Sequence, residues 1–298
     1  MKIAYINSLS RSGSTFLQML LSRQPDSVGL GELARAVRNL CRGAGGDPVD
    51  VAAQQAGVAV PPRLGEPCFC GQAPRECEFW GPLIPQLSQL DAAEAHRRVL
   101  ERFAQQYPGR MIVDGSKTTA SLTRFYLASP EPEWDIRVLF LVRDFRGWVL
   151  SAAKHASITR ALSRRPRIAY GYLQDCYRWW YSNGRALRTL RASGLPHLVV
   201  SYENLVFRTC ETLESIGHFL GSRFAGSSGS GAPAAMHELY GNPGLKFSEE
   251  KRSGIRYDHS WLSDWRSLAA GPLLLPIFRF NRRVCRQSSD LAPGEQYA

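Results

Sequence analysis

The sequence predicts an α/β fold: a single P-loop-like domain with a central parallel sheet flanked by helices. Short apolar runs of strand length alternate with helical patterns along the chain, the order that builds parallel sheets through right-handed crossovers. The 298 residues are 44% hydrophobic, which is enough to fill one large core. A loop rich in serine follows the first apolar run, where sheets of this kind bind anions.

The elements of the N-terminal part follow in order. Residues 2–6 form a short apolar run bounded by polar residues, which is typical of a buried strand. Residues 15–23 have helical spacing, and a Gln-Pro-Asp sequence ends that helix. A second strand over 27–30 and a helix over 33–40 come next. Residues 41–81 are rich in Gly, Pro and Cys, so we expect a loop-rich insertion there.

The remaining elements continue the alternation to the C-terminal part. We expect helices over residues 91–107, 145–155, 170–192 and 208–220, and strands over 110–114, 136–142 and 196–202. Residues 226–233 read GSSGSGAP and predict a flexible loop. The apolar run 268–280 favours a packed helix over a contact with a membrane surface, and residues 288–298 predict a frayed tail. We expect residues 1–298 to form one domain.

Charge and composition limit the class of partner. The net charge of +11 indicates an anionic partner, such as a phosphorylated ligand. The arginines are spread along the chain without a recognised nucleic-acid-binding module, so no nucleic-acid partner is expected. No apolar run reaches the ~18–20 residues of a membrane span, and the first residues do not read as a signal peptide. We therefore expect a cytoplasmic protein without stable membrane insertion; its oligomeric state stays open.

The loop after the first strand, SLSRSGST at residues 8–15, has the features of an anion site. The start of the following helix offers unpaired N–H groups and the positive end of the helix dipole. Glycine lets the backbone approach a phosphate closely, while hydroxyls and a guanidinium add donors. The predicted ligands are Arg11, Ser12, Gly13, Ser14 and Thr15. The loop lacks the Gly-Lys-Ser/Thr of a Walker A motif.

A second candidate anion site follows the strongest predicted strand. Arg143 stands at the carboxyl end of residues 136–142, and Ser151 comes eight residues later, inside the next predicted helix. Alone, this pair is ordinary, because Arg143 can pair with Asp144 and Ser151 can face water. Together with the loop over residues 8–15 at the right topological distance, the pair is more consistent with a functional site than with an ordinary surface pair.

These two motifs resemble those of the sulfotransferase family, in particular its tyrosylprotein, carbohydrate-type and bacterial branches. The Arg-Ser-Gly-Ser-Thr loop is similar to the 5′-phosphosulfate loop of that family, and Arg143 with Ser151 to the residues that hold the 3′-phosphate. The resemblance implies 3′-phosphoadenosine 5′-phosphosulfate (PAPS) as co-substrate, a hydroxyl-bearing acceptor and no metal. It covers residues 2–32, 110–155, 196–220 and 237–265.

The resemblance also implies roles for residues at other strand ends. Glu32, in a Gly-Glu pair after the second strand, corresponds to the general base, and Lys117 and Arg11 to the cations at the leaving oxygen. Tyr202, in Tyr-Glu-Asn-Leu, corresponds to a residue near the adenine, although a core role is equally consistent. His237 and His155 are the fallback bases. The basic residue that closes over the 3′-phosphate is left open among Lys246, Arg252 and Arg256.

Three cysteines gather in ten residues, at Cys68, Cys70 and Cys77. A fourth zinc ligand could come from Cys41 or a histidine, but nothing specifies it. We therefore rank a reduced structural role first, a disulfide second and a zinc site third. No histidine partner is evident nearby, so a catalytic cysteine is not expected. The run Cys-x-Cys-Gly followed by Cys-x-x-Trp resembles one found in some bacterial sulfotransferases.

A second function, that of a nucleotide kinase, is also consistent with the sequence. A P-loop nucleotide kinase that uses Mg·ATP shares the strand–loop–helix start, with Asp144 as a candidate Mg²⁺ ligand.

The sequence does not identify the acceptor. The aromatic helix over 170–192 adds little, because Trp179 and Trp180 cannot both face one side; we expect one in the core and the other near the acceptor.

Overall fold

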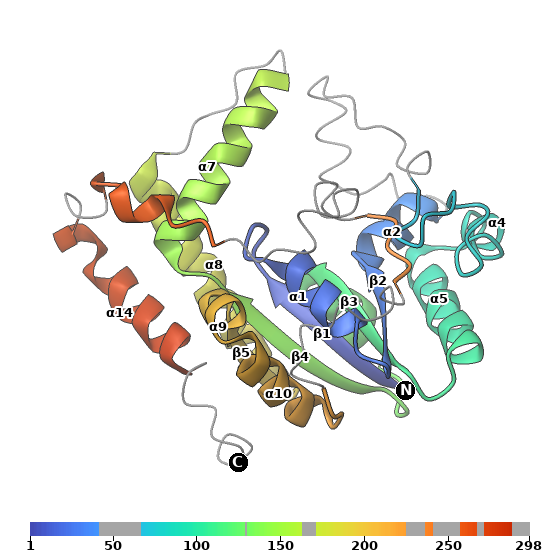
Figure 1. The fold of residues 1–298 in the computed structure, drawn as a ribbon. Helices are drawn as coiled ribbons and strands as arrows, with labels where there is room; N and C mark the ends of the chain where they lie inside the picture. The colour runs from blue at the N-terminus through green and yellow to red at the C-terminus, as the bar shows by residue number, and fades with distance from the viewer. Residues whose placement is uncertain are drawn as a thin grey trace.

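The fold centres on a five-stranded sheet in the order β2-β3-β1-β4-β5, in which every neighbouring pair is parallel (Figure 1). The strands are β1 (Lys2–Ser8), β2 (Ser27–Gly31), β3 (Met111–Lys117), β4 (Asp135–Val142) and β5 (His197–Ser201). This computed structural model confirms the predicted α/β fold with a central parallel sheet. It describes residues 1–41, 67–128, 130–162, 171–224, 236–240, 257–266 and 271–287.

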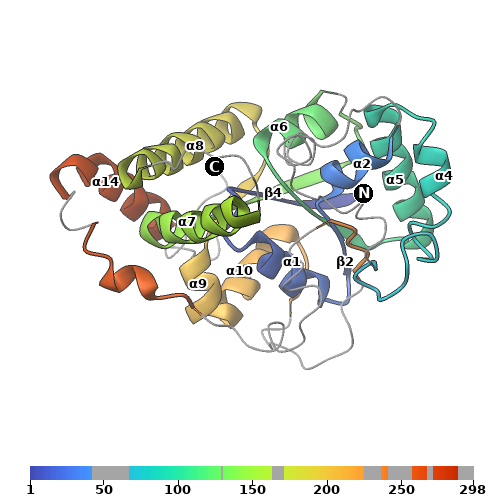
Figure 2. The ribbon, with the colours of Figure 1, turned by 90° about the horizontal axis from the view of Figure 1, so that it is seen from above.

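Helices cover both faces of this sheet (Figure 2). One face carries α1 (Ser14–Ser22), α9 (Tyr202–Phe207) and α10 (Thr209–Leu220). The other carries α2 (Leu33–Leu40), α5 (Ala92–Gln106), α6 (Thr119–Leu122) and α8 (Tyr172–Ser193). The remaining helices are α4 (Ile84–Leu87), the π-helix η2 (Thr123–Leu127), α7 (Phe145–Leu162), the 3-10 helix η3 (Ser260–Ser263) and α14 (Gly271–Gln287).

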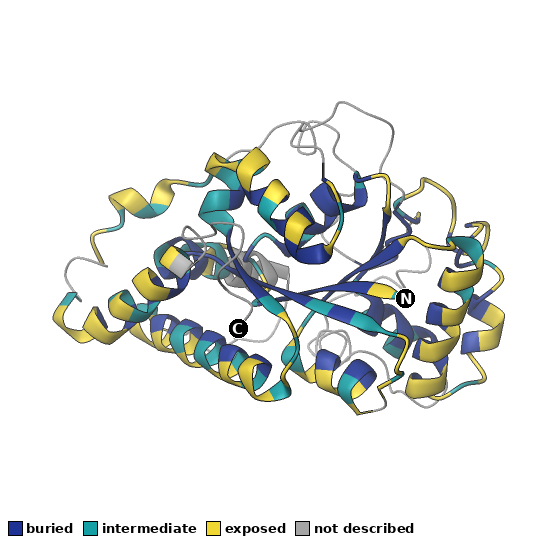
Figure 3. Cartoon of the chain, turned by 90° about the horizontal axis from the view of Figure 1, so that it is seen from below, coloured by how far each residue is buried: buried dark blue, intermediate teal, exposed yellow. Residues whose placement is uncertain are grey.

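The central strands are buried on both sides, which explains their continuous apolar sequences. Along β1, Ile3 and Tyr5 belong to the core under α2, α5 and α8, whereas Ala4 and Ile6 belong to the core under α1 and α10. Figure 3 shows the sheet and the inner helix faces buried and the outer faces exposed. In α8, Trp179 is fully buried and Trp180 half-buried, so one tryptophan lies in the core, as expected.

The expected elements differ from the observed ones mainly in length and in short helices. Helix α7 extends beyond residue 155 to Leu162, and β3 continues to Lys117. The helices α4, α6, η2 and α9 were not predicted, because segments of four to six residues are too short to show a helical period. The C-terminal helix α14 is present despite Pro276. None of the described helices has the length and hydropathy that crossing a membrane requires.

Some predictions fall outside the described residues. They are the flexible loop over residues 226–233, the tail over residues 288–298 and most of the insertion over residues 41–81.

Candidate active site

The topology brings the predicted site residues to one edge of the sheet. Because all five strands are parallel, their carboxyl ends meet at this edge. Strand β1 lies between β3 and β4, so the loop after β1 is flanked by the strand ends that carry Lys117 and Arg143. Glu32 follows β2, and Tyr202 follows β5. Residues at the ends of the four other strands therefore surround one loop.

The loop between β1 and α1 has an unusual backbone. Arg11 and Gly13 both have positive φ, at 74° and 94°. A Cβ on Gly13 would lie 2.5 Å from the ring of Tyr202, so glycine is needed there for conformation and for space. Helix α1 begins at Ser14 without a capping side chain or an acidic residue in its first turn. Its first N–H groups are thus arranged to meet an anion.

Side chains that follow β4 hold this loop in place. The Nη1 of Arg143 donates to the carbonyl of Arg11 at 3.3 Å, and the indole of Trp148 donates to the carbonyl of Ser10 at 2.8 Å. Ser12 and Ser14 are buried, and Arg11 and Thr15 are half-buried. The sequence did not reveal the role of Trp148, since its partner is a backbone carbonyl 138 residues away.

Arg143 is a buried cation, and one of its hydrogen-bond donors is not used within the described part of the chain. Its side chain is 6% exposed, and its guanidinium lies 4.8 Å from the centroid of the Tyr202 ring. The Nε of Arg143 has no hydrogen-bond partner among the described residues. Gly147 leaves room for it, because a Cβ there would lie 3.2 Å from that Nε. A buried donor without a partner is unfavourable, which favours an anionic ligand at this position.

Tyr202 is part of an aromatic surface beside Arg143. Its ring stacks on Tyr257 at 6.1 Å with an interplanar angle of 27°. The hydroxyl of Tyr257 accepts from the indole of Trp261 at 3.0 Å, and the guanidinium of Arg146 lies 4.0 Å from the Trp261 ring centroid. Residues 257–266 thus pack against the start of α7. This contact was not predicted, because nothing local in the sequence indicates which helix these residues meet.

Glu32 and Lys117 form an ion pair across the ends of β2 and β3. Arg35 also contacts Glu32, at 3.3 Å. Burial raises the pKa of Glu32, but the charges and hydrogen bonds of Lys117 and Arg35 outweigh it, so the pKa lies below its usual range. Glu32 is therefore a carboxylate at neutral pH. Lys117 has φ of 70°, an uncommon conformation for a residue with a side chain.

A buried network beneath this pair fixes the start of α2. The hydroxyl of Ser116 accepts from the N–H of Ala34 at 2.8 Å and donates to Asp114. Asp114 also accepts from the hydroxyl of Tyr126 at 2.8 Å and lies fully buried. Burial raises the pKa of Asp114 to about 6. This network positions Glu32, the residue before α2, relative to β3.

Other predicted residues have weaker support. Ser151 lies half-buried in α7 and forms no hydrogen bond within the described part of the chain. It is six residues past the helix start at Phe145, or about 9 Å along the axis. Lys246, Arg252 and Arg256 lie outside the described residues, and so does the side chain of His155.

His237 is not placed as a base, because it lies with the cysteines. Its Nδ1 is 3.3 Å from the sulfur of Cys77, and its Nε2 is 2.6 Å from the hydroxyl of Tyr107. His237 is therefore the histidine neighbour of the cysteines that the sequence left unspecified. The two residues are 160 positions apart, a separation that sequence spacing does not bridge.

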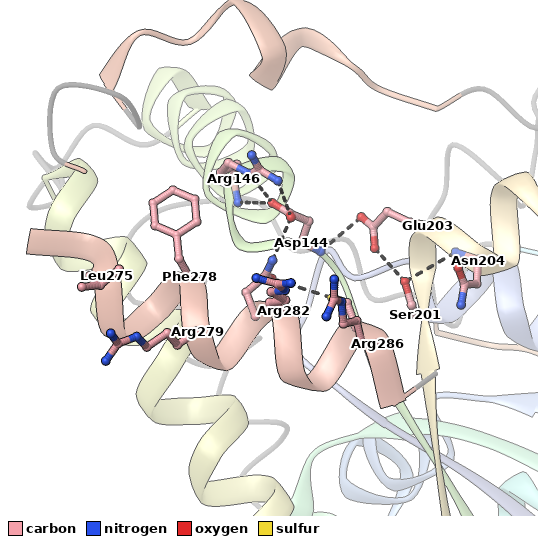
Figure 4. A pocket seen from close by; sticks show the side chains of 12 residues that line it. Asp144, Arg146, Ser201, Glu203, Asn204, Leu275, Phe278, Arg279, Arg282 and Arg286 are labelled. Carbon is pink, nitrogen blue, oxygen red and sulfur yellow. Dashed lines mark hydrogen bonds and ion pairs between the residues drawn. The ribbon is translucent and has the colours of Figure 1, made fainter. Parts of the chain in front are cut away.

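A separate pocket of about 650 Å³ lies where α14 meets the ends of β4 and β5 (Figure 4). Asp144 there accepts from the Nε and Nη2 of Arg146 at 2.9 and 2.8 Å, and from Asn281 at 2.9 Å. Both oxygens of Asp144 thus already have partners, which argues against its role as a Mg²⁺ ligand. None of the predicted co-substrate ligands lines this pocket.

Comparisons with known proteins identify the family of the chain and its fold. Residues 4–226 match the sulfotransferase family. In fold, the chain resembles a sulfotransferase domain from the olefin synthase of Synechococcus PCC 7002, with 18% identity, a TM-score of 0.51 and coverage of 90% of this chain and 88% of that one. It also resembles a sulfotransferase domain from the curacin biosynthetic pathway, with 15% identity, a TM-score of 0.50 and coverage of 89% and 90%. A search of curated proteins finds no match.

Proposed function

The chain belongs to the sulfotransferase family, and from this membership we propose that it transfers a sulfuryl group from PAPS to a hydroxyl of an acceptor. The observation that best supports this proposal is that two candidate anion sites lie at one edge of the sheet. They are the loop over residues 8–15, and Arg143, whose Nε has no hydrogen-bond partner among the described residues. PAPS has two separated anionic groups, a 5′-phosphosulfate and a 3′-phosphate, which match such a pair of sites.

The loop after β1 takes the 5′-phosphosulfate in this proposal. The N–H groups at the start of α1 and the hydroxyls of the loop donate to the phosphate, and Gly13 allows the close approach. The ligands are Arg11, Ser12, Gly13, Ser14 and Thr15. Arg143 and Ser151 take the 3′-phosphate, and Tyr202 lies beside the adenine.

Glu32 acts as the general base. Its carboxylate form at neutral pH suits this role, since a base must be unprotonated before it takes the acceptor proton. The acceptor oxygen forms a bond to sulfur while the bond from sulfur to the bridging phosphate oxygen breaks. The proton moves to Glu32, and 3′,5′-adenosine bisphosphate leaves.

Lys117 and Arg11 stabilise the leaving oxygen. Negative charge grows on the bridging oxygen as the bond to sulfur breaks, and a fixed cation there lowers the barrier. These two side chains supply the positive charge that Mg²⁺ supplies in phosphoryl transfer, so we propose no metal at the reacting groups. The ion pair with Glu32 holds Lys117 at this edge before the co-substrate binds.

A thermal-shift titration tests the co-substrate. We expect 3′,5′-adenosine bisphosphate to raise the melting temperature of the wild type, because a ligand that binds only the native state stabilises it. Arg143→Ala should lose most of this shift. Mg·ATP serves as the competing ligand. If Mg·ATP stabilises the protein and the bisphosphate does not, the sulfotransferase proposal fails and a P-loop kinase replaces it.

A screen for the acceptor follows from a positive titration. Release of 3′,5′-adenosine bisphosphate from PAPS is measured with pools of hydroxyl-bearing compounds, in the wild type and in Glu32→Gln. A true acceptor gives release in the wild type, and the variant should be slower by about 10²-fold or more.

A further inference from the structure

Three cysteines and one histidine form a cluster that includes none of the residues to which we assign the transfer reaction. The sulfurs of Cys68, Cys70 and Cys77 and a ring nitrogen of His237 all lie within 4.8 Å of one another. Cys68, Cys77 and His237 are buried, and Cys70 is exposed. Two loops that are far apart in sequence thus direct four potential metal ligands at one point, and the exposed Cys70 leaves a route of entry.

The spacing of these atoms fits a tetrahedral zinc ion. Cys77 Sγ lies 3.7 Å from the sulfurs of both Cys68 and Cys70, and 3.3 Å from Nδ1 of His237. Zinc–sulfur bonds of about 2.3 Å at tetrahedral angles place two sulfurs roughly 3.8 Å apart. A disulfide instead needs about 2.05 Å between its sulfurs. The cluster has the dimensions of a metal site and not those of a disulfide.

The surroundings of His237 support its role as a ligand. A histidine that binds zinc through Nδ1 carries its proton on Nε2, where it needs an acceptor. The hydroxyl of Tyr107 lies 2.6 Å from that Nε2. Phe79 stacks on the imidazole at 5.5 Å, which fixes the plane of the ring. The histidine is oriented before any metal arrives.

The backbone around the first two cysteines forms a tight turn. Gly71 has φ of 89° and meets nothing within 4 Å on its Cβ side, so glycine serves conformation there. The N–H of Cys68 donates to the carbonyl of Gln72 at 2.7 Å, and the N–H of Gly71 donates to that of Cys68 at 2.9 Å. This turn brings the side chains of Cys68 and Cys70 together.

We propose that Cys68, Cys70, Cys77 and His237 form a structural zinc site. Three soft thiolates with one imidazole favour zinc over hard cations such as Mg²⁺. Four protein ligands leave no open position for substrate, so the metal stabilises the fold and takes no part in the reaction. This proposal favours zinc, which the sequence analysis ranked third for the cysteines, after reduced thiols and a disulfide.

The zinc would join the loop of the three cysteines to residues 236–240, which contact β2 and Glu32 at its end. The N–H of His237 donates to the carbonyl of Gly29 in β2 at 2.7 Å, and the N–H of Phe69 donates to that of Glu238 at 3.1 Å. The N–H of Glu32 donates to the carbonyl of Tyr240 at 3.3 Å. The metal therefore anchors residues 236–240 beside Glu32. The importance of this anchor for catalysis rests on the proposed role of Glu32 as the general base. The zinc site itself does not depend on the proposed function.

Metal analysis of purified protein tests the site. The wild type, expressed with zinc and purified under reducing conditions without chelator, should contain about one zinc per chain. Cys77→Ser should lose it. Cys210→Ser is the matched control, since Cys210 is an exposed thiol outside the cluster, and it should keep the metal. Cobalt in place of zinc should give the visible bands of a tetrahedral thiolate site.

Chelation keeps the test valid if Cys77→Ser does not fold. Removing zinc from the wild type should lower its melting temperature, and adding zinc should restore it. None of these measurements uses PAPS, so failure here is separate from failure of the transferase proposal. A wild type that neither contains nor binds zinc or cobalt overturns the site. So does a disulfide among the three cysteines, found by mass spectrometry of the unreduced protein.

Discussion

Lys117 and Glu32 contact each other across the ends of β3 and β2, with Nζ of Lys117 donating to Oε1 of Glu32. Both side chains are mostly buried, at 17% and 16% exposure. A base and a cation for the leaving oxygen would thus be paired before the co-substrate binds. Lys117 helps to hold the pKa of Glu32 below its usual range, so Glu32 stays ionised at neutral pH.

Lys117→Met should slow transfer and raise the pKa of Glu32, because it removes the nearer of two cations that lower this pKa. The acid limb of kcat/KM should then move to higher pH, and kcat should fall by about 10²-fold or more. The assay is release of 3′,5′-adenosine bisphosphate with an acceptor found by screening, followed across pH.

Arg35→Met is the matched control for this experiment. It also removes a cation that lowers the pKa of Glu32, so its acid limb should move in the same direction. It keeps Lys117, so its kcat at the optimum should fall much less. Equal kcat losses in both variants would refute the separate role of Lys117. An acid limb that stays in place in both would refute Glu32 as the titrating base.

Gly13→Ala should destabilise the protein by about 1–3 kcal/mol and remove binding of the bisphosphate, because alanine at φ of 94° is strained and its Cβ meets the ring of Tyr202. Gly171→Ala is the control, since Gly171 has negative φ and open space at its Cβ. Denaturant unfolding and calorimetry measure the two effects. Full binding by Gly13→Ala would contradict the loop assignment.

Tyr202→Ala should weaken binding of the bisphosphate by about tenfold, through loss of the ring that Arg143 and Tyr257 contact. Tyr202→Phe keeps the ring face and should bind within about threefold of the wild type, a difference under 1 kcal/mol. Calorimetric titration separates the two. A loss in the phenylalanine variant as large as in the alanine variant would assign the contribution to the hydroxyl.

The stability of the protein should depend on Asp114 in a defined pH window. Burial raises its folded-state pKa from 3.8 to about 6, so the protonated form favours the folded state. Its contribution is complete below pH ~4 and is lost as pH rises through about 6, on the order of 3 kcal/mol.

Asp114→Asn removes this titration. The stability of the wild type minus that of the variant, from denaturant unfolding, should therefore decrease between pH ~4 and ~6. Ser27→Ala is the control, because Ser27 is a buried serine of β2 whose hydroxyl has no hydrogen-bond partner among the described residues, and it should leave the slope unchanged. A difference that increases over this window would mean that Asp114 is ionised in the fold at acidic pH.

Local pattern was enough to predict the order of the main strands and helices, and it pointed to residues 8–15 as the candidate anion loop. The apolar runs over residues 2–6 and 136–142 and the short segment over residues 27–30 were predicted as strands, and each lies within a strand of the parallel sheet. Parallel strands share one carboxyl edge, so Glu32, Lys117 and Arg143 were expected together before any contact was known.

Only the tertiary structure decided which side chains meet. It paired Lys117 with Glu32, placed the ring of Tyr202 over Gly13, and brought His237 to cysteines 160 residues away. These contacts join segments that are distant in sequence. Periodicity and spacing report what happens within a strand or a helix turn, and they carry no information about which distant segment packs alongside.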